Sequence, residues 1–133
     1  MRTTYRLTLA SLILISSLAA ATAAPDLSKL PAPSTKTDLS FAKDIKPLFE
    51  KSCFKCHGPE KQKGKLRVDS LEAVLKGGDN GEILTKGDSK KSAVVVAISQ
   101  LDEDSAMPPD GKGTPLTPEQ IGLVRAWIDQ GAK

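Results

Sequence analysis

The clearest pattern in the chain is an apolar stripe at helical spacing close to the C-terminus. Its positions recur every three or four residues and are Ile121, Val124, Trp127 and Ile128. Thr117 can cap a helix that begins at Pro118, and Gln120 completes a capping box because it stands three residues after the cap. Gly131 provides the stop signal. The sequence therefore predicts a C-terminal helix between Pro118 and Gly131.

Two earlier segments show a similar pattern. The first runs from about Asp44 to Cys53, tolerates Pro47 in its opening turn, and has a largely apolar face made of Ile45, Leu48, Phe49 and Ser52. The second follows Asp69, which we expect to be its N-cap because Glu72 stands three residues on, and it ends at the glycine pair 77–78.

A further helix is expected after Asp88, where the apolar positions are Val94, Val95 and Ile98. By propensity, its run of three valines is equally compatible with a strand. A Pro- and Gly-rich loop, residues 102–115, separates this segment from the C-terminal helix, and a loop of that length in a compact domain usually has a function. The pattern as a whole predicts an all-α domain of three to four helices over residues 41–133.

The N-terminal region has a different composition. Arg2 and Arg6 precede an uncharged, mostly apolar run over 7–20, and small residues follow at 21–23. This arrangement predicts a signal peptide over residues 1–24 and an exported protein, periplasmic or otherwise outside the cytoplasm. The apolar run is shorter than the ~20 residues that span a bilayer, so no stable membrane insertion is expected. Residues 25–40 are rich in Pro, Ser and Thr and predict a flexible linker.

The motif that carries chemistry is Cys53-Phe54-Lys55-Cys56-His57. On a helix, positions i, i+3 and i+4 share one face, so both thiols and the imidazole would point the same way. This spacing is the signature of c-type haem attachment, and it predicts one covalently bound haem c. A zinc site would lack a fourth Cys or His ligand, a thioredoxin-like dithiol would need a strand-helix-strand setting, and a structural disulfide leaves His57 unexplained.

Elimination points to the sixth iron ligand. His57 is the only histidine, and Met1 leaves with the signal peptide, so Met107 is the remaining candidate. Pro108 and Pro109 follow it and stiffen the chain that carries the thioether. We therefore expect His57 and Met107 to bind the iron; a lysine or an open sixth position are the alternatives.

Charge and composition limit the classes of function and partner that we expect for the chain. The formal charge of +3 falls to +1 when Arg2 and Arg6 are removed, which argues against a nucleic-acid binder. Residues 43–67 nevertheless carry eight basic side chains against three acidic ones, so this segment could steer an acidic redox partner. The aromatic residues after the signal peptide are few: Phe41, Phe49, Phe54 and Trp127. A buried flat cofactor would make up for the small apolar core.

The domain resembles the planctomycete-type cytochrome c domain, a branch of the class I c-type cytochromes. The matching stretches are residues 41–58, 64–69, 76–78, 87–92, 107–109 and 127–132. The resemblance implies a small class I fold whose first and last helices cross beside the haem, with Leu48 or Phe49 against Val124 and Trp127. It also implies that Cys53 and Cys56 form the thioethers, that His57 is the proximal ligand and that Met107 is the distal one.

Family members often carry this module fused to large domains, so a chain of 133 residues suggests a free-standing monomeric carrier or a small subunit. The expected activity is outer-sphere transfer of single electrons between redox partner proteins. The sequence contains no second histidine and no Ser-His-Asp set, so these features give no indication of an enzyme. The alternative is a haem-based sensor of small ligands with a weak or open sixth position.

Overall fold

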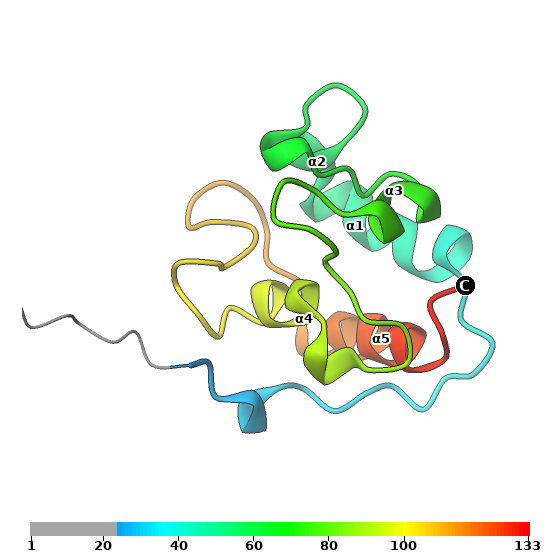
Figure 1. The fold of residues 1–133 in the computed structure, drawn as a ribbon. Helices are drawn as coiled ribbons and strands as arrows, with labels where there is room; N and C mark the ends of the chain where they lie inside the picture. The colour runs from blue at the N-terminus through cyan, green and yellow to red at the C-terminus, as the bar shows by residue number, and fades with distance from the viewer. Residues whose placement is uncertain (1–23) are drawn as a thin grey trace, which may run out of the picture.

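Five α-helices, three 3₁₀ turns and one π-helical turn form the regular structure of residues 24–133, which the computed structural model describes. The helices are α1 (Lys46–Ser52), α2 (Phe54–His57), α3 (Leu71–Lys76), α4 (Ala93–Ile98) and α5 (Pro118–Asp129), and the turns are η1 (Leu27–Lys29), η2 (Phe41–Ile45), η3 (Lys63–Lys65) and η4 (Ser89–Lys91). No strand occurs in this part of the chain, so the all-α class is confirmed (Figure 1). The predicted signal peptide lies outside the described residues, apart from residue 24.

Helix α5 forms as its sequence predicts. The Thr117 hydroxyl accepts a hydrogen bond from the Gln120 N–H at 3.3 Å, and the Gln120 side chain accepts one from the Thr117 N–H at 2.9 Å. Most of the helix is buried, because it packs into the core over more than one face; its buried residues are Ile121, Gly122, Val124, Arg125, Ala126, Trp127 and Ile128. Beyond Asp129 the chain turns at Gly131, where φ is +99°. Helix α5 is thus the central element of the fold.

The first helix begins earlier than predicted, with the π-helical turn η2 leading directly into α1. Phe41 is 4% exposed, and its ring centroid lies 6.3 Å from that of Phe49 and 5.8 Å from that of Trp127. The first and last helices therefore meet through Phe41, a residue that the expected contact did not include. The reason is that η2 extends the apolar stripe by one turn before Ile45.

Helix α3 begins one residue later than expected. Its N-cap is Ser70, whose hydroxyl accepts a hydrogen bond from the Ala73 N–H at 3.2 Å. The prediction of Asp69 as the cap is wrong, because this carboxylate instead accepts two hydrogen bonds from the Arg67 guanidinium, at 2.9 and 2.6 Å. The predicted stop is confirmed at Gly77, where φ is +75° and a Cβ would lie 2.0 Å from the Gly81 carbonyl oxygen.

Helix α4 confirms the helical interpretation of the valine run, and the strand alternative is wrong. Asp88 caps the preceding turn η4 by accepting from the Lys91 N–H at 3.1 Å. The buried Ser92 hydroxyl donates to the Asp88 carbonyl at 2.8 Å, which fixes the entry into the helix. Val95 and Ile98 are then buried one turn apart, so the apolar positions follow helical spacing.

The segment predicted to be a flexible linker differs from that expectation in its second half. Residues 31–39, which we call the strap, run along α5 (Figure 1). The Ser34 N–H donates to the Gly122 carbonyl at 2.9 Å, and the Gln130 side chain donates to the Lys36 carbonyl at 2.8 Å. Composition cannot predict this packing, because the strap is held mainly through backbone groups that every residue carries.

A glycine and an arginine of α5 make the strap fit. A Cβ at Gly122 would lie 2.7 Å from the Ala32 carbonyl oxygen, so the strap can approach only because this helix position has no side chain. The guanidinium of Arg125, which is 4% exposed, donates to the Pro31 carbonyl and, at 3.1 Å, to the Ser89 hydroxyl. The strap is therefore anchored to a buried charge as well as to the helix backbone.

Candidate functional site

The Cys-x-x-Cys-His motif lies where the first helix breaks. Helix α1 ends with a hydrogen bond from the Cys53 N–H to the Phe49 carbonyl at 2.7 Å, and the backbone of Cys53 then departs from helical geometry (φ −121°, ψ −32°). The Cys53 carbonyl accepts from the N–H groups of both Cys56 and His57, at 3.0 and 2.8 Å. A single turn therefore holds the three residues at i, i+3 and i+4.

The two cysteines are free thiols, and both are half-buried. Burial raises the pKa of the Cys53 thiol to about 11, so it is neutral at physiological pH. A reactive dithiol requires a lowered thiol pKa instead. The environment of Cys53 thus argues against the thioredoxin-like alternative and suits a thiol that is consumed in a permanent thioether.

His57 is held through its backbone rather than its ring. Its carbonyl accepts from the Val68 N–H at 2.9 Å, and the chain turns immediately at Gly58, where a Cβ would lie 2.5 Å from the Phe54 carbonyl oxygen. The imidazole Nδ1 is buried without a hydrogen-bond partner among the described residues. A buried polar atom without a hydrogen-bond partner lowers the stability of the fold by about 1–3 kcal/mol. Such atoms are rare in folded proteins, so this one calls for an explanation.

A second side chain shows the same lack of a hydrogen-bond partner. The Ser99 hydroxyl, at the end of α4, is also buried without a partner among the described residues. These two side-chain atoms belong to the motif and to the segment from which the Met107 loop starts. The unpartnered Nδ1 of His57 fits a group bound beside the motif, as an attached haem would be.

Met107 lies in the long loop as predicted, and the end of α4 holds it there. The Met107 N–H donates to the Ala97 carbonyl at 2.9 Å. The Gln100 side-chain amide donates to the carbonyls of Met107 and Pro108, at 2.8 and 3.3 Å. Sequence reasoning missed Gln100, because a polar residue just after a helix carries no signal that distinguishes it from ordinary surface.

The Met107 loop also reaches the motif. A Cβ at Gly113 would lie 3.2 Å from the Cβ of Pro108 and 3.6 Å from the carbonyl oxygen of Ser52, the residue before the first cysteine. The structure therefore brings the Met107 loop against the end of α1, directly before Cys53. Segments more than 50 residues apart in sequence meet here.

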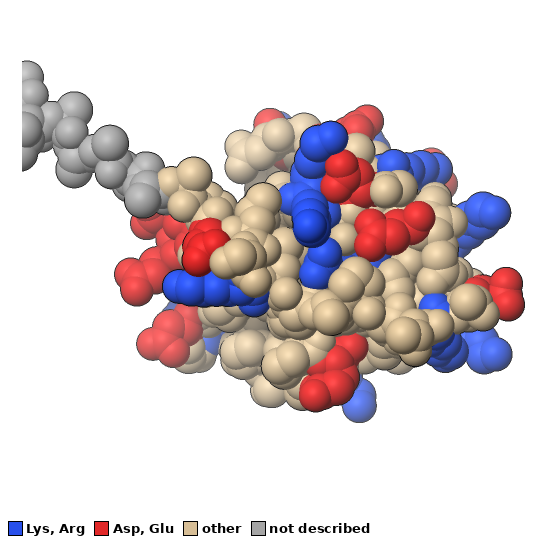
Figure 2. Space-filling model, turned by 90° about the horizontal axis from the view of Figure 1, so that it is seen from below, with Lys and Arg blue, Asp and Glu red and all other residues tan. Residues whose placement is uncertain are grey.

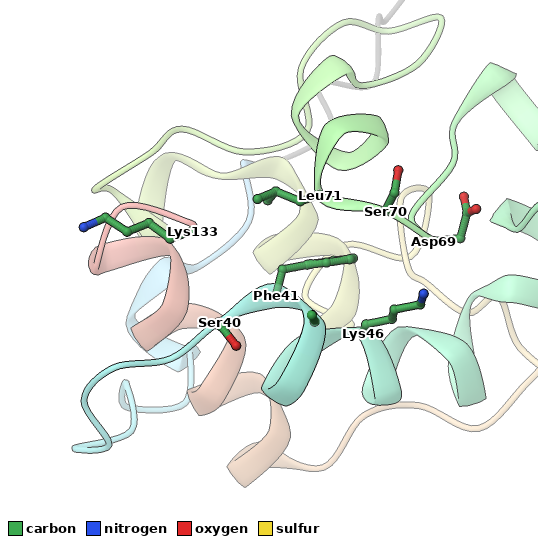
Figure 3. A pocket seen from close by; sticks show the side chains of 8 residues that line it. Ser40, Phe41, Lys46, Asp69, Ser70, Leu71 and Lys133 are labelled. Carbon is green, nitrogen blue, oxygen red and sulfur yellow. The ribbon is translucent and has the colours of Figure 1, made fainter.

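A metal site of the zinc type finds no support in the arrangement. Among residues 24–133, no three His, Cys, Asp or Glu side chains are grouped so that they could hold a metal ion. A cavity of about 370 Å³ does open between η2, the start of α1 and residues 69–71, with Phe41 and Lys46 among its lining residues (Figure 3). None of the four predicted site residues lines this cavity. It is therefore separate from the candidate site.

Charge differs between the two segments that flank the site. The basic arm, residues 43–67, has a local excess of positive charge, whereas the loop over 102–112 carries four acidic side chains and one lysine. Figure 2 shows acidic side chains gathered at the end of the molecule where, in Figure 1, this loop lies.

Among the described residues, no helix is both long and apolar enough to cross a lipid bilayer.

Comparison with known proteins gives one family. Residues 53–111 match the family described as Planctomycete cytochrome C. No curated protein and no solved structure matches the chain. The matched stretch begins at the first cysteine of the motif and includes Met107 and the loop that carries it. The comparison therefore confirms, over residues 53–111, the resemblance to the planctomycete-type cytochrome c domain.

Proposed function

We propose that this protein is an exported electron carrier with a single covalent haem c. Cys53 and Cys56 form the thioethers, and His57 and Met107 are the axial ligands. Haem iron supplies one-electron oxidation and reduction. The observation that carries the proposal is the approach of Gly113, in the Met107 loop, to Ser52, the residue before Cys53. The motif and Met107 themselves lie in the stretch that matches a cytochrome c family.

The residues of the chain give this site its properties. A thioether ligand such as Met107 raises the reduction potential relative to a nitrogen donor. Both ligand segments are fixed by backbone hydrogen bonds, His57 through Val68 and Met107 through Ala97, each at 2.9 Å. A ligand set held in this way changes little between oxidation states, which suits transfer of electrons without bond making or breaking. No further acid or base is needed for this activity, so we propose a carrier rather than an enzyme.

Expression with the signal peptide, in a host that attaches haem outside the cytoplasm, tests the attachment. The denatured protein should retain the mass of one haem, and Cys53→Ala together with Cys56→Ala should lose it. The oxidised protein should show the weak red absorption of a Met–iron bond. Met107→Leu should abolish that absorption, whereas Ser105→Ala, a change in the same loop, should leave it intact. Protein without retained haem mass would refute the proposal.

Carbon monoxide separates the carrier from the sensor. The reduced carrier should resist carbon monoxide because Met107 occupies the sixth position, and Met107→Leu should bind it readily. Rapid binding to the unaltered protein would favour the sensor and would overturn the axial role of Met107.

We further propose that the basic arm docks an acidic redox partner by transient electrostatic contact. The oxidation rate with anionic ferricyanide should fall as salt rises, because screening weakens the attraction. Lys61→Glu combined with Lys63→Glu should lower the rate at low salt. Lys86→Glu with Lys90→Glu, outside the arm, changes the net charge equally and should lower it less. Equal effects of the two pairs would remove the docking role of the arm.

A further inference from the structure

We propose that Gln100 is a positioning residue that holds the Met107–Pro108 backbone and thereby strengthens the bond between the Met107 sulfur and the iron. This inference rests on the proposed function, since it requires Met107 to be an axial ligand. Gln100 itself is not a ligand. Its side chain acts on the backbone that carries the ligand.

The hydrogen bonds of the loop identify Gln100 as its main anchor. Within the described chain, three hydrogen bonds join residues 102–115 to the rest of the molecule. One runs from the Met107 N–H to the Ala97 carbonyl, and the other two run from the Gln100 amide to the carbonyls of Met107 and Pro108. All three meet the chain at Met107 and Pro108. The loop is therefore tied to the protein at the residue that supplies the sulfur.

The remaining polar contacts of the loop are internal. Asp102 accepts from the Ser105 hydroxyl at 2.6 Å and from the Asp104 N–H at 3.3 Å, and the Lys112 N–H donates to the Pro109 carbonyl at 3.0 Å. These bonds shape the loop but do not attach it to α4. Loss of the Gln100 amide would leave one hydrogen bond to hold Met107.

The backbone at Gln100 supports a role for its side chain. Its φ is +55°, in the left-handed region that glycine adopts most easily. Residues with a Cβ seldom occupy this region unless their surroundings hold them there. The two hydrogen bonds from the amide are such a constraint, because they require this side chain to project from a left-handed residue.

Two variants separate the side chain from the backbone. Gln100→Gly accepts the left-handed conformation without strain and deletes the amide. Gln100→Glu keeps the shape but places an acceptor against two carbonyls. Asp38→Gly is the matched control, since Asp38 also has a positive φ, +56°, but lies in the strap.

The measurement is the affinity of the oxidised holoprotein for imidazole, followed by loss of the red absorption. Imidazole must displace the sulfur, so a weaker Met–iron bond gives tighter imidazole binding. The two hydrogen bonds, one exposed and one partly buried, correspond to about a five- to thirtyfold tightening in Gln100→Gly and Gln100→Glu. Asp38→Gly should bind imidazole as the unaltered protein does. Unaltered affinity in both Gln100 variants would overturn the inference.

A second comparison shows whether the effect passes through Met107. In a Met107→Leu background nothing has to be displaced, so adding Gln100→Gly should leave imidazole affinity unchanged. A tightening that persists there would mean general loosening of the loop and would refute the positioning role. If Met107→Leu alone binds imidazole no more tightly than the unaltered protein, it is the axial assignment of Met107 that fails.

Discussion

The substitution Gly122→Ala distinguishes a packed strap from a free linker, because the two give opposite signs. Alanine in a helix interior normally stabilises a protein by about 1 kcal/mol relative to glycine. Here, however, the new Cβ would lie 2.7 Å from the Ala32 carbonyl oxygen, which is too close for the strap to remain in place. The strap must move away from α5, and the bonds that hold it are weakened.

Two of those bonds set the magnitude. Displacement removes the bond from the Ser34 N–H to the Gly122 carbonyl, worth about 1 kcal/mol, and that from the buried Arg125 guanidinium to Pro31, worth about 1.5–3 kcal/mol. Subtracting the gain in helix propensity leaves a net destabilisation of about 2 kcal/mol. For a domain of this size, that lowers the Tm by roughly 10 °C.

Chemical denaturation of the holoprotein, followed by fluorescence of the single tryptophan, measures the change in unfolding free energy. The control is a chain that lacks residues 25–35, in which Gly122→Ala should instead stabilise by about 1 kcal/mol. If Gly122→Ala stabilised the full chain as well, the strap would not be packed against α5, and the flexible-linker interpretation would be restored.

Three further predictions concern the core, an ion pair and a thiol. Trp127→Phe should destabilise by about 2–3 kcal/mol in denaturant unfolding, because it loses buried volume and the 2.8 Å bond from the indole N–H to the Lys133 carbonyl; a loss below 0.5 kcal/mol, the scale of surface changes, would contradict this packing. Hydrogen bonds from the Lys36 ammonium and a backbone N–H hold the pKa of Asp44 below 3.8, so the ionised carboxylate stabilises the fold above that pH. The stability gap between the unaltered protein and Asp44→Asn should shrink as the pH falls below 3.8 in acid titrations, and a gap that widens there would be inconsistent with the pair. In protein made without haem attachment, alkylation of Cys53 should be slow at pH 8 and accelerate as the pH approaches its pKa of about 11, and fast alkylation at pH 8 would show that the thiol is not buried.

Local sequence signals predicted most of the helices. The capping box at Thr117 and the stop at Gly131 were both correct, because these residues act through groups within a few positions of themselves. The cap of α3 was wrong for the converse reason. Asp69 has the right side chain for a cap, but Arg67 competes for it, and nothing in the local pattern ranks the two partners.

The role of Gln100 and the packing of the strap could not be predicted from the sequence, because both depend on contacts with backbone groups. The cysteines, the histidine and the methionine were all selected by their chemistry. Gln100 was not, because its role depends on carbonyls that lie seven and eight residues further along a loop. The strap was missed for a similar reason, since it is held by carbonyls that have no side-chain signature.

One backbone oxygen links the first and the last residues of the helical region 41–133. The oxygen of Lys133 accepts both the N–H of Phe41 and the indole N–H of Trp127, each at 2.8 Å. A short linker could therefore close residues 41–133 into a ring, and new ends could be opened in an exposed turn such as the one around Gly111. Such a circular permutant would contain all five α-helices in one chain, without the strap. The same geometry would let this module be spliced into a host protein through a single opening in the host's surface.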